Sequence, residues 1–218
     1  MSGREPQLEV LTEHSFYLGV SQLTARDPGL AQIVAQSGNP PFWTYPPGFP
    51  GITLAILGQQ VSSESARATF GKLENALSAV TPDAFLGLSD VALRGIGFSR
   101  QKASYVRQIA SDLVAARIDL EALERVDDAK ARARLMQLRG VGRWTADAYL
   151  LFALKRPDAW PSGDLALEVA VSELRGHPVR LATDAVDRIA TDWSPLRAVA
   201  ARMLWCHYLQ QRGRLHSA

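Results

Sequence analysis

Apolar residues recur at intervals of three and four positions along most of this 218-residue chain. That spacing places them on one side of an α-helix, whereas the strict alternation typical of half-buried strands is scarce. The helical spacing is carried by Ile52–Leu77, Gln101–Ala115, Asp128–Leu138, Thr145–Leu154, Leu165–Leu174, Thr183–Thr191 and Leu196–Tyr208. Only Leu8–Leu11 and Phe16–Val20 suggest strands, and both runs are short. The pattern therefore predicts an all-α protein.

Residues that begin and end helices support this prediction. Thr81-Pro82, Ser99 and Ser194-Pro195 are typical of helix starts, because they combine a capping side chain with a first-turn residue. The longest predicted loop is Gly38–Gly51, where five prolines, with the pair Phe42-Trp43 among them, argue against a helix.

Composition excludes several classes of protein. The longest apolar run, Ala148–Leu154, is far shorter than the roughly 18 residues that a membrane helix needs. Met1–Val10 carries charges and no apolar core, so we expect no secretory signal. Cys206 is the only cysteine, which excludes a disulfide framework and an iron–sulfur cluster held by four thiolates of this chain. We expect a soluble protein of a reducing cytoplasm, with no membrane partner.

The positive charge is concentrated in one segment. Net charge is only +2, but residues 93–145 carry 11 basic and 6 acidic side chains, a local excess of 5. Arginine makes up 20 of the 24 basic residues, and its planar fork matches phosphate oxygens. A solvated basic face would show the same excess, so this pattern indicates nucleic acid as one of two open readings.

A short motif occurs twice within that segment. Leu93-Arg94-Gly95-Ile96-Gly97 is echoed by Leu138-Arg139-Gly140-Val141-Gly142, and both copies lie between predicted helices. Two glycines around one apolar residue form a tight turn into the next helix, whose first N–H groups and dipole attract anions. A DNA phosphate fits such a terminus. A plain turn with glycine caps is the alternative for either copy taken alone.

Five stretches in a fixed order resemble a known family. They are Ile56-Leu57-Gly58-Gln59-Gln60-Val61-Ser62, Gly97-Phe98-Ser99-Arg100-Gln101-Lys102-Ala103, Leu138-Arg139-Gly140-Val141-Gly142-Arg143-Trp144-Thr145-Ala146-Asp147, Trp160-Pro161-Ser162-Gly163-Asp164-Leu165, and Trp193-Ser194-Pro195-Leu196-Arg197 with Trp205. Together they resemble the helix-hairpin-helix (HhH-GPD) superfamily of DNA glycosylases, most closely its 3-methyladenine DNA glycosylase II (AlkA-like) branch. The resemblance implies a two-lobed helical fold with the active-site cleft between the lobes.

The resemblance also implies base excision, in which a damaged nucleotide is flipped out and its N-glycosidic bond is hydrolysed. Asp164 stands at the family's catalytic position. Cleavage of the bond builds positive charge on the sugar, which a carboxylate stabilises while it orients or deprotonates the attacking water. An aspartate before the apolar run Leu165–Val171 is also a typical helix cap, and both roles are compatible.

The resemblance assigns a base pocket to Trp144, Trp205 and Tyr149. The bifunctional branch has a lysine at the position of Trp144, and that lysine attacks the sugar and leads to strand cleavage through a Schiff base. With Trp144 there, we expect water as the nucleophile and no AP lyase step. An alkylated purine is positively charged, so aromatic faces hold it by stacking and cation–π attraction. For Trp205 the alternative is a plain core aromatic.

Contacts to the DNA duplex follow from the same resemblance. Gln60 stands at the position of the wedge that fills the gap left by the flipped nucleotide, although it could instead bond its own turn. We expect the phosphate to be bound by the hairpin at about residues 136–148, through Gly140, Gly142, Arg143 and Thr145. Backbone carbonyls of Met136, Leu138 and Val141 match a site for Na⁺ or K⁺, and no cofactor is required.

We divide the chain accordingly into residues 1–50, a segment that packs on the C-terminal lobe, 51–163, a helical lobe with the hairpin, and 164–218, the helices that complete the second lobe. About fifty residues precede Ile52, so the family's N-terminal β-rich subdomain is expected to be absent or vestigial. The expected partner is double-stranded DNA with alkylated bases, bound by a monomer in a bacterial cytoplasm, at the nucleoid.

Two other functions remain open. One is a non-catalytic hairpin protein that binds duplex DNA, which leaves Asp164 and the tryptophans unexplained. The other is a bifunctional glycosylase/AP lyase for oxidised bases, which Trp144 disfavours. Lys102 follows the first glycine turn and is the rival amine, but a solvated lysine with a pKa of about 10.4 offers little free amine at neutral pH.

Overall fold

The structure is a computed structural model, and it describes residues 10–213. Every regular element in those residues is a helix, which confirms the all-α prediction. The weak strand signal at Phe16–Val20 does not correspond to a strand: these residues lie inside the first helix, with Phe16 and Val20 on its buried side. Leu8–Leu11 falls partly outside the described residues, as does most of Met1–Val10. No helix in the described range is long and apolar enough to cross a membrane.

Contacts divide the chain into two units. Among the described residues, unit 1 is Tyr45–Leu154, and unit 2 combines residues 10–44 with 155–213. The boundaries expected from the sequence, at 50/51 and 163/164, differ from these. The difference has a local cause at each end. Tyr45 belongs to unit 1 because its N–H donates to the carbonyl of Phe152 (3.0 Å) and the two rings stack at 4.5 Å. Lys155 belongs to unit 2 because its carbonyl accepts the N–H of Leu11.

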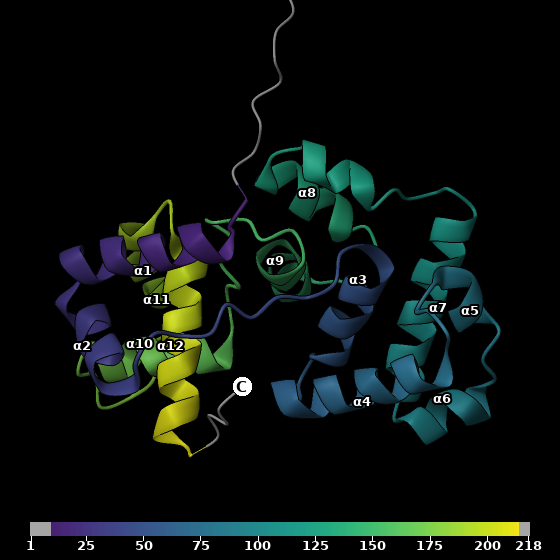
Figure 1. The fold of residues 1–218 in the computed structure, drawn as a ribbon, viewed down its shortest axis with the longest axis horizontal. Coiled ribbons are helices and arrows are strands. Elements are labelled where there is room, and N and C mark those ends of the chain that lie inside the picture. Colours follow the sequence, from purple (N-terminus) through teal and green to yellow (C-terminus); the bar gives the residue numbers. More distant parts are fainter. Residues whose placement is uncertain (1–9, 214–218) are drawn as a thin grey trace, which may run out of the picture. The chain divides into compact units, whose positions relative to one another are not determined.

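Unit 1 is built around helix α9. Its elements are α3 (Gly48–Leu57), α4 (Ser63–Ala76), α5 (Pro82–Leu86), α6 (Asp90–Ile96), α7 (Arg100–Val114), the 3₁₀ helix η1 (Glu121–Arg125), α8 (Asp128–Leu135) and α9 (Arg143–Phe152). Helix α3 packs on α4, α7 and α9, and α8 packs on α9 (Figure 1). Every residue from Thr145 to Leu151 is buried, so α9 is surrounded on all sides.

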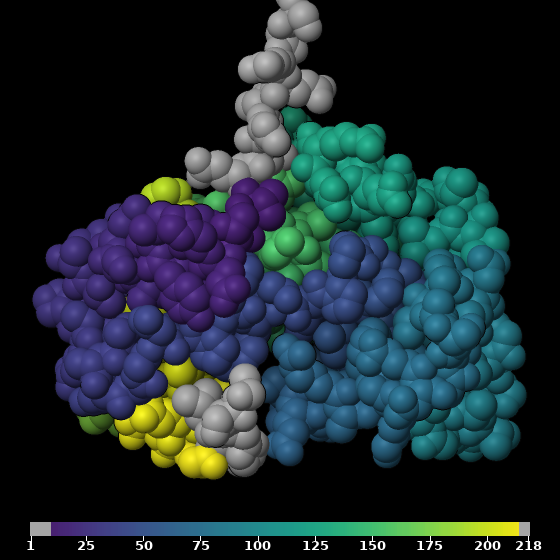
Figure 2. Space-filling model, in the orientation of Figure 1, coloured from purple at the N-terminus to yellow at the C-terminus, as the bar shows by residue number. Residues whose placement is uncertain are grey.

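Unit 2 is built around helix α12. Its elements are α1 (Glu13–Arg26), α2 (Pro28–Ser37), α10 (Leu165–Leu174), α11 (Thr183–Ala190), the 3₁₀ helix η2 (Thr191–Trp193) and α12 (Arg197–Gln211). Helix α12 contacts α1, α2 and α10, and α1 with α2 forms the continuous purple surface in Figure 2. Arg202 of α12 has no exposed surface, donates to the carbonyl of Trp43 at 3.0 Å and lies over the rings of Phe16 and Phe42.

Two of the predicted helix starts are confirmed and one is wrong. Thr81 caps α5 and Ser99 caps α7 through their hydroxyl oxygens. Ser194-Pro195 does not begin α12: Ser194 ends η2 and its hydroxyl donates to Asp158, so the helix starts later, at Arg197.

The long helix expected over Ile52–Leu77 is also wrong. The chain leaves the helical path at residues 58–62, where Gln60 adopts a left-handed conformation (φ 56°), and α3 and α4 are separate helices. Helix α3 starts at Gly48, inside the segment expected to be a loop. Pro50 is tolerated there because first-turn N–H groups have no helical partner to lose.

Candidate active site

Asp164 is the N-cap of α10. Its Oδ1 accepts the backbone N–H of Leu167 at 2.9 Å and the indole Nε1–H of Trp205 at 3.1 Å. A capping carboxylate is fixed by the helix that it caps, and the indole adds a second constraint from α12. The side chain remains only half-buried. Unit 2 therefore presents an oriented carboxylate at a helix start, and the capping role coexists with the chemical one.

The loop that leads to Asp164 is held by a residue that the sequence analysis missed. Asp187 of α11 accepts the indole Nε1–H of Trp160 at 2.9 Å and the hydroxyl of Ser162 at 2.6 Å. Gly163 then takes a left-handed conformation (φ 79°), which glycine adopts without strain. Asp187 lies in an ordinary amphipathic helix, so nothing in its sequence context marks this role.

The hairpin of unit 1 connects α8 to α9. Gly140 has φ 82°, and a Cβ there would lie 2.2 Å from the ring of Tyr105, so only glycine fits. Gly142 is the N-cap of α9 and has no side chain to cap the helix. A Cβ on Gly142 would meet nothing within 4 Å. The start of α9 is thus approachable and not capped by a side chain of its own, as an anion site requires.

The first copy of the motif differs at this point. Gly97 ends α6 in a left-handed conformation, and the hydroxyl of Ser99 caps α7 by accepting the N–H of Lys102. A terminus capped by its own side chain has fewer donors to offer a phosphate. For the first copy the structure therefore favours the plain helix–helix turn, and the two motifs are not equivalent.

Two residues predicted to bind phosphate behave differently. The Arg143 side chain is 61% exposed, and its Nε lies 3.6 Å from Oδ2 of the buried Asp147, which also pairs with Arg132. The Arg143 side chain is therefore held in place by Asp147 and is still exposed to solvent. Thr145 is only 3% exposed, and its hydroxyl oxygen accepts a hydrogen bond from Gln59 inside unit 1. The side chain of Thr145 is therefore a packing contact, but its residue lies in the first turn of α9, so its role at the phosphate stays a prediction.

The aromatic residues of the predicted pocket differ in burial. Trp144 is half-buried, and a Cβ added to Gly58 would lie 3.5 Å from the edge of its ring. Tyr149 has no exposed surface, its hydroxyl oxygen accepts the N–H of Gly48 at 3.1 Å, and burial raises its pKa to about 12. Tyr149 is therefore a core residue of unit 1 with no face available to a base, and its prediction as a pocket residue is corrected. Trp144 belongs to unit 1, whereas Trp205 belongs to unit 2.

The turn between α3 and α4 carries the predicted wedge. Gln60 is exposed and left-handed, so its side chain projects from the turn. The neighbouring Gln59 turns inward, where its Nε2 donates to the Gly140 carbonyl (2.8 Å) and to Thr145. Lys102 donates from Nζ to the carbonyls of Leu57 (2.7 Å) and Gln59 (2.9 Å). The expectation that Lys102 is solvated is wrong, since it is half-buried and burial lowers its pKa.

The carbonyls predicted to hold a monovalent cation lie in one short turn. Met136 is the C-cap of α8, and the carbonyl of Leu138 accepts the N–H of Val141 at 3.1 Å. A carbonyl oxygen has two lone pairs, so this bond leaves Leu138 able to bind an ion as well. Main-chain oxygens of this kind fit Na⁺ or K⁺, and the cation stays a prediction.

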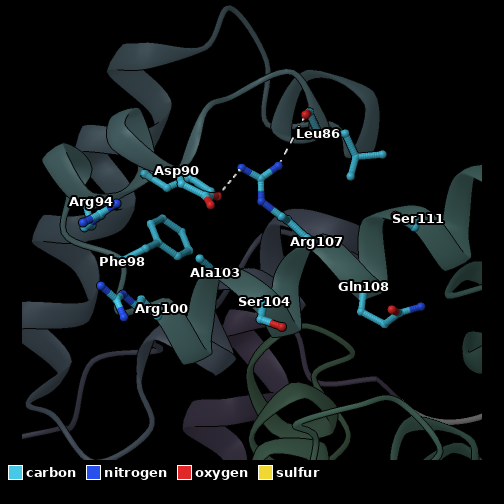
Figure 3. A pocket seen from close by; sticks show the side chains of 11 residues that line it. Leu86, Asp90, Arg94, Phe98, Arg100, Ala103, Ser104, Arg107, Gln108 and Ser111 are labelled. Atoms are coloured by element: carbon cyan, nitrogen blue, oxygen red, sulfur yellow. Dashed lines mark hydrogen bonds and ion pairs between the residues drawn. The ribbon is translucent and has the colours of Figure 1, made fainter.

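The described residues include a groove that takes no part in this arrangement. It has a volume of about 460 Å³, lies between α5, α6 and α7, and includes Arg94 and Arg100 in its lining. Arg107 inside it is already engaged by Asp90 and by the carbonyls of Leu86 and Leu88 (Figure 3). None of the predicted site residues lines this groove.

The fold and these motifs define a class of protein. Residues 53–195 match the family described as HhH-GPD superfamily base excision DNA repair protein. The chain belongs to this superfamily.

The chain is also similar to individual proteins of known sequence or structure. Over 155 residues the chain is 30% identical to the Schizosaccharomyces pombe protein named DNA-3-methyladenine glycosylase 1, which covers 69% of this chain and 68% of that protein. A crystal structure of a Bacillus halodurans DNA-3-methyladenine glycosidase is 27% identical, with a TM-score of 0.71 over 89% of this chain and 91% of that one. The Schizosaccharomyces pombe 3-methyladenine DNA glycosylase in complex with abasic DNA shares the fold, with a TM-score of 0.77 at 23% identity and coverage of 92% and 100%.

Proposed function

We propose that this protein is a DNA glycosylase that excises alkylated bases of the 3-methyladenine type from double-stranded DNA by hydrolysis and leaves an intact abasic strand. One observation carries the proposal: the carboxylate of Asp164 is fixed at the start of α10 by both Leu167 and Trp205. The names of the relatives, DNA-3-methyladenine glycosylase 1 among them, support the substrate class.

The chemistry follows from where charge develops. As the bond between the base and C1′ breaks, its electron pair leaves with the base and the sugar becomes an oxocarbenium-like cation. An alkylated purine is already cationic, so it departs as a neutral base. The Asp164 carboxylate stabilises the cationic sugar and orients a water molecule. The water oxygen bonds to C1′, and its proton passes to the carboxylate and then to solvent.

The aromatic side chains supply recognition of the cationic base. Trp144 and Trp205 are both half-buried, so each retains surface for a ligand. A cation over an indole face is stabilised by roughly 1–2 kcal/mol relative to a neutral base. This preference favours alkylated purines over the undamaged bases that surround them.

The absence of a lyase step is part of the proposal. A Schiff base needs a free amine beside C1′, and Trp144 occupies the position where the bifunctional branch has lysine. The Nζ of Lys102 donates to two main-chain oxygens, which supports an ammonium form committed to helix α3. Lys130 pairs with Asp127. We further propose that the protein acts as a cytoplasmic monomer without a required cofactor.

The direct test is the release of free bases. Purified protein is incubated with duplex DNA methylated by dimethyl sulfate, and the soluble products are separated by chromatography. We expect 3-methyladenine from the wild type and none above background from Asp164→Asn. Binding of the duplex without base release would instead support the non-catalytic hairpin protein. Release of oxidised bases with strand cleavage would support the glycosylase/AP lyase.

A further inference from the structure

We propose that Gln59 and Lys102 are positioning residues that fix the Gln60 turn to the phosphate-binding hairpin. Binding of a DNA phosphate by the hairpin and insertion of Gln60 into the duplex are thereby coupled. This inference rests on the proposed function, and it adds a role in nucleotide flipping for two side chains that do not touch the reacting atoms. All of the contacts that carry it lie within unit 1.

Gln59 provides the link to the hairpin. Its Nε2 donates to the carbonyl of Gly140 at 2.8 Å and to the hydroxyl oxygen of Thr145 at 2.9 Å. The first acceptor belongs to the glycine turn and the second to the first turn of α9. One amide group therefore contacts both sides of the helix terminus at which a phosphate is expected.

Lys102 provides the link to helix α7. Its Nζ donates to the carbonyls of Leu57 and Gln59 at 2.7 and 2.9 Å, where α3 ends. The last carbonyls of a helix lack intrahelical partners and carry the negative end of the dipole, so an ammonium group is well placed there. Lys102 thus binds two carbonyls on either side of Gly58, the C-cap of α3.

The two links act on the backbone of the wedge itself. The carbonyl of Gln59 belongs to the peptide plane that precedes Gln60, and Lys102 fixes that plane. Gln60 has φ 56°, a conformation that costs a non-glycine residue roughly 1–2 kcal/mol and persists only where its surroundings enforce it. Gln59 and Lys102 together supply the enforcement. Without them the Gln60 turn is free to relax, while the hairpin and Asp164 are unchanged.

The role of the Gln60 turn can be measured separately from catalysis by comparing paired and unpaired substrates. A nucleotide that is already unpaired costs less to extrude than a paired one, so wedge placement matters less for it. The same alkylated base is placed in a fully paired duplex and in an otherwise identical duplex with a three-nucleotide bubble around it. Single-turnover excision rates are measured on both. A 2-aminopurine next to the lesion reports unstacking by fluorescence, independently of bond cleavage.

The variants are Gln59→Met and Lys102→Met, which keep the length of each side chain and remove its hydrogen bonds. We expect excision from the paired duplex to fall at least tenfold, excision from the bubble to fall less than threefold, and the 2-aminopurine signal to decrease. Lys102→Arg keeps a cationic donor and should recover most of the paired-duplex rate. Lys72→Met is the matched control, because Lys72 is exposed on α4.

Equal losses on both substrates would overturn the inference, since they indicate a general structural defect, and so would unchanged rates. Thermal unfolding is measured for every variant. If Lys102→Met does not fold, Gln59→Met decides: this variant is neutral and cannot donate to the Gly140 carbonyl, so it must show the same selective loss. A wild type that releases no base from either substrate contradicts the proposed function, which is a different result from an equal loss in the variants.

Discussion

The indole of Trp205 and the carboxylate of Asp164 are joined by a hydrogen bond of 3.1 Å between Nε1 and Oδ1. The same oxygen accepts the N–H of Leu167, so one atom is held by the start of α10 and by a side chain of α12. The bond turns the expected stacking residue into an orienting residue as well. The Nε1–H of the indole donates to the Asp164 carboxylate, so Trp205 lies beside the proposed catalytic group.

Replacing Asp164 by Asn removes the negative charge of the side chain and keeps its size and shape, so it tests the role of the charge alone. Asparagine caps helices about as well as aspartate, so folding and DNA binding should be retained. Excision should fall by at least two orders of magnitude, which corresponds to about 3 kcal/mol of lost transition-state stabilisation. The measurement is single-turnover base release. A rate within threefold of the wild type would remove Asp164 from the catalytic role.

Gly142→Asp should weaken DNA binding without harming the fold. A Cβ meets no neighbour there, and aspartate is a favourable N-cap that stabilises α9 by about 1 kcal/mol. The added negative charge repels the phosphate expected at this terminus. Affinity for damaged and undamaged duplexes should fall together, measured by fluorescence anisotropy at several salt concentrations. Gly142→Asn is the neutral control, and loss confined to damaged DNA would assign this turn to the base pocket instead.

Gly140→Ala should have the opposite profile. The new methyl group would overlap the ring of Tyr105, and φ 82° is strained for alanine. Overpacking and backbone strain together should destabilise the protein by about 3 kcal/mol. Denaturant unfolding measures this loss. A stability equal to that of the wild type would contradict the close approach of Tyr105 to the hairpin.

Borohydride should trap no covalent complex between the protein and its DNA. The product of base excision should be an intact abasic strand, cut only by hot alkali or a separate endonuclease. As an ammonium group that donates to two carbonyls, the Nζ of Lys102 has no lone pair with which to attack C1′. Denaturing electrophoresis after borohydride treatment is the measurement. A trapped band that disappears in Lys102→Ala would overturn the monofunctional assignment.

Asp27 should make unit 2 sensitive to acid. Burial raises the pKa of its carboxyl, but hydrogen bonds from Trp193 and Arg175 outweigh burial and hold the pKa below its usual value. A carboxyl with a lowered pKa in the folded state stabilises the protein above its unfolded pKa of about 3.9, and this stabilisation is lost as the pH falls through the folded value. Asp27→Asn should lower the free energy of unfolding by about 2 kcal/mol at pH 7.

The same substitution should cost less stability at pH 3, where part of the wild-type advantage is already lost. Denaturant unfolding of both proteins at the two pH values checks this. A difference between wild type and Asp27→Asn that is equal at pH 7 and pH 3 would contradict the role of the charge.

The spacing of apolar residues and the capping residues correctly predicted helices whose ends depend on neighbouring residues in the sequence. The period of apolar residues gave α10 to the residue, and Ser99 was recognised as a cap from its neighbours alone. The interruption at Gln60 was missed because apolar residues continue on both sides of it. The backbone there is bent by contacts with Lys102 and the hairpin, which are distant in sequence.

Predictions for the candidate site failed where burial decided the outcome. A motif shows that Thr145 and Tyr149 follow the hairpin, but it does not show how many helices surround α9. Both side chains are buried, so neither the Thr145 hydroxyl nor the Tyr149 ring is open to a ligand. Asp187 and Gln59 act only through partners that the fold brings to them, so sequence alone offered no signal for either.

Unit 2 is assembled from two segments that lie on either side of unit 1 in the sequence. A ribosome makes α1 and α2 before α12, which packs on both of them and is made only after the whole of Tyr45–Leu154. At 5–20 residues per second this delay is on the order of ten seconds. During that time Phe16 and Leu30, which are fully buried in the finished protein, lack their final cover while unit 1, a continuous segment, is free to fold. During synthesis the apolar faces of α1 and α2 are therefore complete before α12, the helix that packs on both of them, has been made.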